Sequence, residues 1–170
     1  PILAEKLALL GGGKVRERPF PPHPMIGEEE KRAVQEVMDS GQLSTFIASP
    51  GEHFLGGVRI RRFEREFADY HEVAHAVAFN SATSALHAAV VACGVRAGEE
   101  VILPPYTFTS TATCCLMHNA IPVFADIDAD IFCLDAAQAE KAVTPRTRAI
   151  IPVHLFGGAA DMDAIMALAG

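Results

Sequence analysis

The chain of 170 residues lacks a hydrophobic run long enough to cross a membrane. A transmembrane helix needs about 20 consecutive apolar residues, whereas the apolar residues near the N-terminus are interrupted by Glu5 and Lys6. The pattern therefore predicts neither a membrane span nor a signal peptide. Because 50% of the residues are hydrophobic, we expect a globular chain with a substantial core. The cytoplasmic location that we expect rests on the cysteines, which suit a reducing cytosol.

Positive charge is also scarce, since 14 Lys and Arg face 21 Asp and Glu for a net charge of −7. Proteins that bind nucleic acids need clustered Lys and Arg to displace counterions from phosphates. The one basic cluster comprises Arg59, Arg61, Arg62 and Arg65. It shares a predicted helix with Glu64 and Glu66, which indicates a solvated or subunit-facing surface rather than a nucleic-acid interface.

The chain also lacks the residue spacings that are typical of metal sites and disulfides. The four cysteines are Cys93, Cys114, Cys115 and Cys133, and none forms a Cys-x-x-Cys pair. No two histidines stand four residues apart within a predicted helix. The cysteines lie in apolar contexts, which is typical of buried thiols in a reducing cytosol. We therefore expect no metal site.

The N-terminal part of the chain predicts little packed structure. Residues 11–27 are rich in Gly and Pro, so we expect residues 1–27 to form an extended arm suited to reaching a partner subunit. Helices are predicted over 28–39 and 58–70 from their apolar stripes. The first stripe comprises Ala33, Val34 and Val37. Residues 42–57 have no periodicity and predict a long loop, a kind of segment that often carries function.

From residue 73 onward, apolar runs alternate with helical patterns. Strands are predicted over 76–79, 101–103, 121–125 and 149–153, and helices over 83–93, 109–118, 135–143 and 161–169. This alternation predicts an α/β three-layer sandwich with a mainly parallel sheet. Ligands in such sheets bind beyond the carboxyl ends of the strands. The loops 80–84, 104–109, 126–130 and 154–158 should therefore meet there.

The turn at residues 80–84, Asn-Ser-Ala-Thr-Ser, follows an apolar run and opens a predicted helix. Free amides at a helix N-terminus bind anions, most often phosphate. The buried face of this helix is predicted to comprise Leu86, Ala89, Val90 and Cys93. The alternative is an ordinary Ser/Thr cap, which needs no ligand. The chain has no Gly-x-Gly-x-x-Gly turn and no Walker lysine, so one phosphate and a flat ring fit better than a dinucleotide or triphosphate.

Five motifs in this order closely resemble the DegT/DnrJ/EryC1/StrS aminotransferases. They lie at residues 80–86, 104–112, 122–128, 144–157 and 160–165. The resemblance implies a pyridoxal 5'-phosphate (PLP) enzyme of the aspartate-aminotransferase fold, PLP fold type I. It covers nearly the whole chain but only the N-terminal part of such an enzyme. We therefore expect residues 28–170 to be the N-terminal part of the PLP-binding large domain, truncated before its end.

The resemblance assigns cofactor-binding roles to particular residues. Thr83 and Ser84 match the phosphate cup, with Ala82 beside them, and Phe108 matches the aromatic residue that stacks on the pyridine ring. A core position is the alternative for Phe108.

Further candidates for the pocket are Tyr106, Thr111 and His154. A core histidine bonded to the backbone is the favoured alternative for His154. Asp126 and Asp128 resemble an acid/base pair, but turn chemistry is the commoner role of Asp-x-Asp after a strand.

Family enzymes need a Schiff-base lysine and an aspartate that pairs with the pyridinium nitrogen. Both belong to motifs beyond those matched here. The lysines of this chain are Lys6, Lys14, Lys31 and Lys141, and none matches the catalytic position. We therefore expect this chain to carry no catalytic residue and to be inactive alone.

The function implied by the resemblance is transamination of a keto-sugar, commonly nucleotide-linked, with glutamate or glutamine as amino donor. A homodimer is expected, because active sites in the family are shared between subunits. Two alternatives remain open. One is a non-catalytic binding or regulatory protein that keeps the phosphate cup, and the other is a PLP-dependent sugar dehydratase with histidine in place of the lysine.

Overall fold

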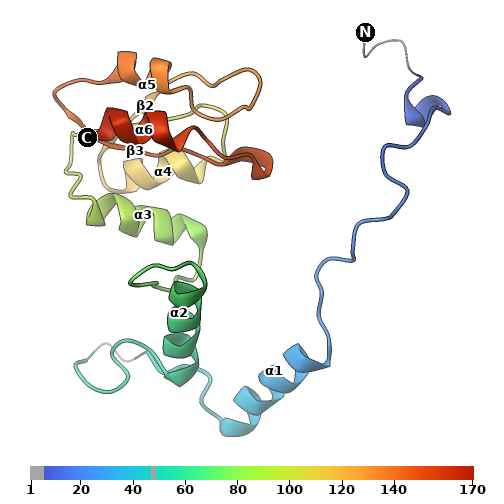
Figure 1. The fold of residues 1–170 in the computed structure, drawn as a ribbon. Helices are drawn as coiled ribbons and strands as arrows, with labels where there is room; N and C mark the ends of the chain where they lie inside the picture. The colour runs from blue at the N-terminus through green and yellow to red at the C-terminus, as the bar shows by residue number, and fades with distance from the viewer. Residues whose placement is uncertain (1–5, 47–48) are drawn as a thin grey trace. The chain divides into compact units, whose positions relative to one another are not determined.

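A computed structural model describes residues 6–46 and 49–170 (Figure 1). The chain divides into two compact units, residues 1–61 and 62–170. In the first, the predicted arm contains a short 3-10 turn, η2 (Ala8–Leu10), and otherwise no regular element over residues 11–27. The first five residues of the arm, and residues 47–48 of the predicted loop, lie outside the described part.

Helix α1 (Glu28–Ser40) has an N-terminal hydrogen bond and a C-terminal glycine that define its two ends. The Gly27 N–H donates to Glu30 Oε2 at 2.7 Å, and three acidic residues occupy the first turn. Gly41 terminates the helix in a left-handed conformation with φ 67°, which glycine adopts without steric cost. The predicted helix is confirmed to within one residue. Burial of its stripe is not, because Val34 is exposed and Val37 only half-buried.

Helix α2 (Val58–Tyr70) has the predicted bounds and continues from the first unit into the second. The further helices are α3 (Ala82–Ala92), α4 (Ser110–Met117), α5 (Ala136–Ala142) and α6 (Met162–Ala169). Each agrees with its predicted range to within one residue at either end. Among the described residues, no helix is both long and apolar enough to span a bilayer.

The described residues of the second unit form a parallel sheet of β1 (Glu100–Leu103), β2 (Ile121–Phe124) and β3 (Thr147–Ile150), in the order β2-β1-β3. The central strand β1 is buried on both faces. Val101 and Leu103 pack in one cluster with residues of α3 and α4, and Ile102 packs in another with residues of α5 and α6. The alternation of successive side chains along a strand thus produces the predicted three layers.

The predicted strand over 76–79 is wrong for this structure. Residues 75–79 have no strand assignment, and β1, β2 and β3 pair only with one another in the described part of the chain. A strand is stabilised by its ladder, so an apolar run without a pairing neighbour does not become one. The Ala78 N–H donates instead to the Glu64 carboxylate of α2 at 2.8 Å.

Strand β3 begins two residues earlier than predicted and ends at Ile150 rather than residue 153. A register shift lies between Glu100 and Val101, because Glu100 pairs with Thr147 and Val101 with Ala149. Arg148 therefore has no partner residue on β1, and it is exposed. Because this irregularity places the charged Arg148 inside β3, the apolar pattern that predicted the strand begins only at residue 149.

The cysteines only partly follow the prediction of buried thiols. Cys114, Cys115 and Cys133 are buried, but Cys93 is exposed at the end of α3. Ala89 of the predicted buried face of α3 is exposed as well, so only Leu86 and Val90 of that face pack in the core. Burial and the neighbouring Cys114 raise the pKa of the Cys115 thiol to about 12, which leaves no thiolate nucleophile there at neutral pH.

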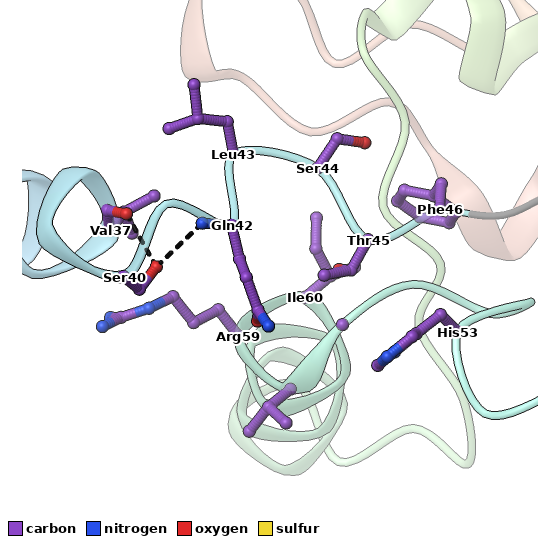
Figure 2. Close-up of a pocket in the computed structure, with 12 residues that line it drawn as sticks. Val37, Ser40, Gln42, Leu43, Ser44, Thr45, Phe46, His53, Arg59 and Ile60 are labelled. Carbon is purple, nitrogen blue, oxygen red and sulfur yellow. Dashed lines mark hydrogen bonds between the residues drawn. The ribbon is translucent and has the colours of Figure 1, made fainter.

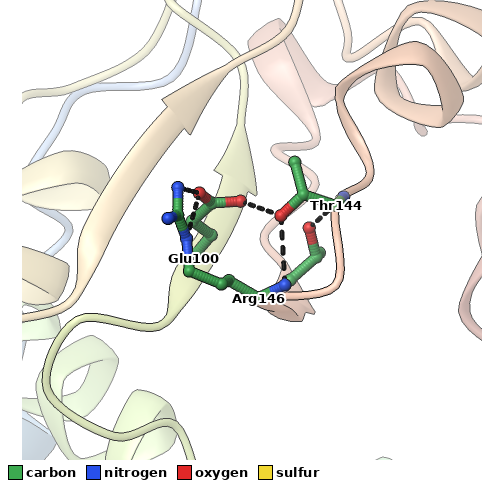
Figure 3. Close-up of polar contacts among 4 residues, drawn as sticks. Glu100, Thr144 and Arg146 are labelled. Atoms are coloured by element: carbon green, nitrogen blue, oxygen red, sulfur yellow. Dashed lines mark hydrogen bonds and ion pairs between the residues drawn. The ribbon is translucent and has the colours of Figure 1, made fainter.

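Glu100 is a buried acid at the start of β1, with a side chain only 4% exposed (Figure 3). Its carboxylate accepts hydrogen bonds from the Thr144 hydroxyl and from the Arg146 guanidinium, whose Nε lies 2.9 Å from Oε1. The hydrogen bond from Thr144, followed by those from Arg146, holds the pKa of Glu100 below its usual range. The segment before β3 is thereby tied to the central strand.

We expect Glu100→Gln to lower the melting temperature at pH 7 and to reduce its acid dependence. A carboxyl whose folded-state pKa is depressed stabilises the fold above the unfolded pKa of about 4.3, and that contribution is lost as the pH falls through the folded-state pKa. Thermal melts from pH 7 down to pH 3 measure the effect. The two curves should converge in acid, and a constant difference at all pH values would contradict this role.

Candidate active site

The N-termini of α3 and α4 lie at the carboxyl edge of the sheet. Each helix is followed by a short connection that enters the next strand at its amino end. These connections meet, since the Gly98 N–H donates to Asn119 O at 2.8 Å and the Ile121 N–H to Glu99 O at 2.8 Å. Both helices therefore run antiparallel to the strands, and they pack on one another. Their first turns lie at the edge where ligands of parallel α/β sheets bind.

The first turn of α3 carries the predicted phosphate-cup residues. Ser81 is the N-cap, and its Oγ accepts from the Ser84 N–H at 3.1 Å and lies 3.0 Å from Ser84 Oγ. The Ser84 amide is thus bonded to the Ser81 side chain, as in the ordinary Ser/Thr cap that was the alternative prediction for this turn. Among the described residues, the amides of Ala82 and Thr83 make no hydrogen bond, as the first amides of a helix generally do not. These amides and the Ser84 hydroxyl remain able to bind an anion.

Phe108 precedes α4 at the same edge and is 75% exposed. A core aromatic would be buried, so the alternative of a core position is wrong for this structure. The Phe108 carbonyl accepts from the Thr111 N–H at 3.1 Å, which fixes the backbone of the turn. The ring is accessible for stacking, and its role at the cofactor stays a prediction.

The three further candidates make contacts of their own. Tyr106 packs against Phe132 and Phe156, with ring centroids 6.2 Å and 6.1 Å away. Thr111 is buried, and its hydroxyl lies 2.9 Å from the Thr107 hydroxyl. His154 Nδ1 accepts from the Ala160 N–H at 3.0 Å, which is the predicted bond to the backbone, but His154 is exposed, so the predicted core position is wrong. These bonds and contacts indicate structural roles, and none excludes a place near a ligand.

The two aspartates after β2 serve turns. Asp128 Oδ1 accepts from the N–H groups of Asp130 and Ile131 at 2.8 Å and 3.1 Å. Asp126 Oδ1 accepts from the Ile127 N–H at 2.8 Å. The turn interpretation of this Asp-x-Asp motif is therefore confirmed.

A cavity of about 410 Å³ lies within the first unit, between the end of α1 and the start of α2 (Figure 2). Sequence reasoning did not predict it. The only signal was the length of the loop over 42–57, which does not show which side chains converge. A further cavity of about 390 Å³ is lined by Phe63, Glu64, Phe67, Val73 and residues 75–79. Neither includes Thr83, Ser84 or Phe108.

Relatives of the chain are aminotransferases and biosynthetic proteins of bacteria. The L-glutamine:2-deoxy-scyllo-inosose aminotransferase of Streptomyces lividus is 46% identical over 170 residues, which is 98% of this chain and 38% of the relative. The spore coat polysaccharide biosynthesis protein SpsC of Bacillus subtilis is 46% identical over 146 residues, 86% of this chain and 35% of that protein. The chain thus spans little more than a third of these relatives.

Solved structures share the fold. The crystal structure of 3-amino-5-hydroxybenzoic acid synthase superposes with a TM-score of 0.79 at 37% identity, over 88% of this chain and 37% of the synthase. A putative sugar aminotransferase of Streptococcus pneumoniae in its PLP form gives a TM-score of 0.76 at 34% identity, over 89% of this chain and 36% of that chain. The fold is therefore part of PLP fold type I, and the cofactor of such enzymes is PLP.

The sequence profile of the DegT/DnrJ/EryC1/StrS aminotransferase family matches residues 24–170, which include both units from the end of the arm onward. All five motifs of the sequence analysis lie inside this match. The match covers most of the chain, and the parallel sheet with helices on both faces agrees with the solved relatives. The chain therefore belongs to the DegT/DnrJ/EryC1/StrS aminotransferase family.

Proposed function

We propose that this chain supplies the cofactor-binding segment of a PLP-dependent aminotransferase that acts on a keto-sugar or a related cyclic ketone. The observation that carries the proposal is the placement of two helix N-termini at one edge of the sheet, with the unbonded amides of Ala82 and Thr83 on α3 and the exposed ring of Phe108 before α4. This arrangement is suited to binding a ligand in which an anionic group is joined to a flat ring.

The residues present fit the cofactor. The amides of Ala82 and Thr83 and the Ser84 hydroxyl would hold the phosphate, favoured by the positive end of the α3 dipole. Phe108 would stack on the ring and orient it. When bound, PLP supplies an electron sink for chemistry at the amino-bearing carbon. These residues would contribute anchoring and orientation, and no catalytic residue is assigned within residues 1–170.

The relatives support the substrate class. Several are named for glutamine as donor and scyllo-inosose derivatives as acceptor, and SpsC is named for polysaccharide biosynthesis. We extend these names to this chain as a proposal: a keto-sugar or keto-cyclitol acceptor, nucleotide-linked in the sugar case, with glutamine or glutamate as donor. A cytoplasmic homodimer completes the proposal, since residues 11–27 form no helix or strand and suit a contact with a second subunit.

The binding or regulatory protein and the dehydratase stay alternative proposals. The lysines Lys6, Lys14, Lys31 and Lys141 all lie outside the matched cofactor motifs. A binding or regulatory protein with the same phosphate cup needs no lysine, and a dehydratase of this fold uses histidine instead. None of these candidates uses one of the four lysines, so covalent labelling of this chain tests the assignment of the lysines and not the choice between the candidates.

We expect Phe108→Ala to weaken PLP binding by on the order of 1 kcal/mol, the scale of an aromatic contact. Equilibrium dialysis of the 170-residue chain against PLP measures the dissociation constant. Phe20→Ala is the matched control, because Phe20 is similarly exposed, at 77%, but lies in the arm. Equal dissociation constants for wild type and Phe108→Ala would remove Phe108 from the cofactor site.

A further inference from the structure

Three aromatic rings converge at the carboxyl edge of the sheet, one from each of the connections that leave β1, β2 and β3. The ring centroids of Tyr106, Phe132 and Phe156 lie 6.1 Å to 6.4 Å from one another. We call these three residues the aromatic triad. All three belong to the second unit, and Tyr106 stands two residues before Phe108 in the same connection. The triad therefore shares its edge of the sheet with the proposed cofactor residues.

The rings of the triad are not core residues. Tyr106 is 49% exposed, Phe132 is 44% exposed and Phe156 is 79% exposed. The three rings contact only one another among the aromatic residues of the described chain. Clustered aromatic side chains that stay accessible are typical of surfaces that bind a ligand. The triad thus keeps a large part of its aromatic surface open to one.

The backbone at Phe156 is one that turns normally give to other residues. Phe156 (φ 53°, ψ 21°) and Gly157 (φ 82°) form the centre of a turn that is closed by the Gly158 N–H, which donates to Leu155 O at 2.8 Å. Two successive positive φ angles are typical of a type I′ turn, in which Asn-Gly is the preferred pair. A bulky side chain at the first of these positions is strained.

Phe132 has the same unusual backbone. Its φ is 60°, and its N–H donates to Asp128 O at 2.9 Å across a turn. Glycine or asparagine is the usual residue in this left-handed conformation. The turns therefore explain neither phenylalanine. Strained residues of this kind cluster at functional sites, where the side chain is needed in that place.

The charges of the three connections limit the class of ligand. Residues 104–109, 125–135 and 154–160 contain no Lys or Arg, whereas the second of these segments contains four aspartates. An anionic group would meet like charge there and no lysine or arginine. The ring of a polyol instead presents apolar C–H groups, which pack against the negative face of an aromatic ring. The triad is therefore suited to a neutral ring rather than to an anion.

From this arrangement we infer that Tyr106, Phe132 and Phe156 form a platform on which the uncharged polyol ring of the amino acceptor stacks. Because it names a site for the acceptor, this inference rests on the proposed function. It separates two tasks at one edge of the sheet. The N-terminus of α3 and Phe108 hold the cofactor, and the aromatic triad holds the ring that receives the amino group.

The test titrates the 170-residue chain with 2-deoxy-scyllo-inosose, a neutral cyclitol ketone, and follows saturation-transfer NMR signals of the ring protons. We expect saturable binding that weakens about three- to tenfold in Phe156→Leu, which keeps an apolar side chain but loses the aromatic ring. Phe156→Tyr keeps the ring and should bind within about threefold of wild type. Phe20→Leu is the matched control, because Phe20 is similarly exposed, at 77%, but lies in the arm.

Two asparagine variants separate a ligand platform from a structural cluster. Asparagine suits the left-handed backbone, so Phe156→Asn and Phe132→Asn should keep or raise the melting temperature while ring binding weakens about three- to tenfold. A lower melting temperature in both variants would overturn the inference, because the rings would then stabilise the fold. Failure of wild type to bind the ketone, or unchanged binding in Phe156→Leu, would overturn it as well.

A second copy of the chain is the other occupant that an exposed aromatic cluster could take. Sedimentation velocity on wild type and Phe156→Asn tests this alternative. The inference predicts the same assembly for both proteins, and a smaller assembly in Phe156→Asn would contradict it.

PLP binding is measured on the same samples. Absence of ring binding with PLP binding intact refutes the platform and leaves the proposed function standing. Ring binding that depends on the triad, without PLP binding, refutes the proposed function but supports a site for a neutral ring.

Discussion

Borohydride reduction of the 170-residue chain in the presence of PLP should leave no stoichiometric covalent cofactor. Reduction traps PLP only where a lysine holds it. Lys6 and Lys14 lie in the arm, Lys31 lies in α1 and Lys141 lies in α5. Noncovalent PLP held through phosphate and ring is removed by dialysis. Intact mass and peptide mapping measure the label.

The Streptococcus pneumoniae aminotransferase, solved in its PLP form, is the positive control and should retain about one equivalent, as expected of a lysine that holds its cofactor covalently. Stoichiometric label on one lysine of this chain would contradict the account, because that lysine would then be a catalytic residue that the motifs failed to identify. Scattered, substoichiometric label on exposed lysines is the background expected of both proteins.

Ser84→Glu should weaken PLP binding at least about tenfold while leaving the helix intact. Ser84 is the third residue of α3, and glutamate three residues after a serine N-cap completes a capping box with Ser81. The new carboxylate repels the phosphate at close range, and such repulsion is worth several kcal/mol near a protein surface. Equilibrium dialysis against PLP and against pyridoxal, which lacks the phosphate, measures the effect.

Pyridoxal binding should not change in Ser84→Glu, because the repulsion acts on the phosphate. Gln138→Glu is the control, since Gln138 occupies the same third position of α5 after the Asp135 cap. A loss of PLP binding in both variants would indicate a general charge effect. Unchanged PLP binding in Ser84→Glu would place the phosphate elsewhere.

Sequence reasoning predicted the layers because they depend on local periodicity. The alternation of Val101, Ile102 and Leu103 fixes which side chains face each layer of helices, and the helix bounds follow from caps such as Ser81 and Asp135. Parallel order then brings the first turns of α3 and α4 to the carboxyl edge. The Ser/Thr turn was predicted from this pattern of a strand, a turn and a helix, whereas Phe108 was predicted from the resemblance to the family.

The features that the sequence did not predict depend on long-range pairing. Residues 76–79 have a strand pattern, but a strand also needs a neighbour, which no pattern within the segment reveals. The cavity near Thr45 and His53 arises where an aperiodic loop folds back on Gly57. Cys93 lies in an apolar segment and is nevertheless exposed, because the neighbours that decide burial come from other elements.

The most direct test of the central claim, that the cofactor lies between the α3 N-terminus and Phe108, is PLP binding to a Ser84→Glu/Phe108→Ala double variant. The two changes act on opposite ends of the cofactor, so their free energies should add within about 0.5 kcal/mol. The account predicts saturable binding of one PLP by wild type, displaced by inorganic phosphate, and the combined loss in the double variant. Equal binding by wild type and the double variant would contradict it.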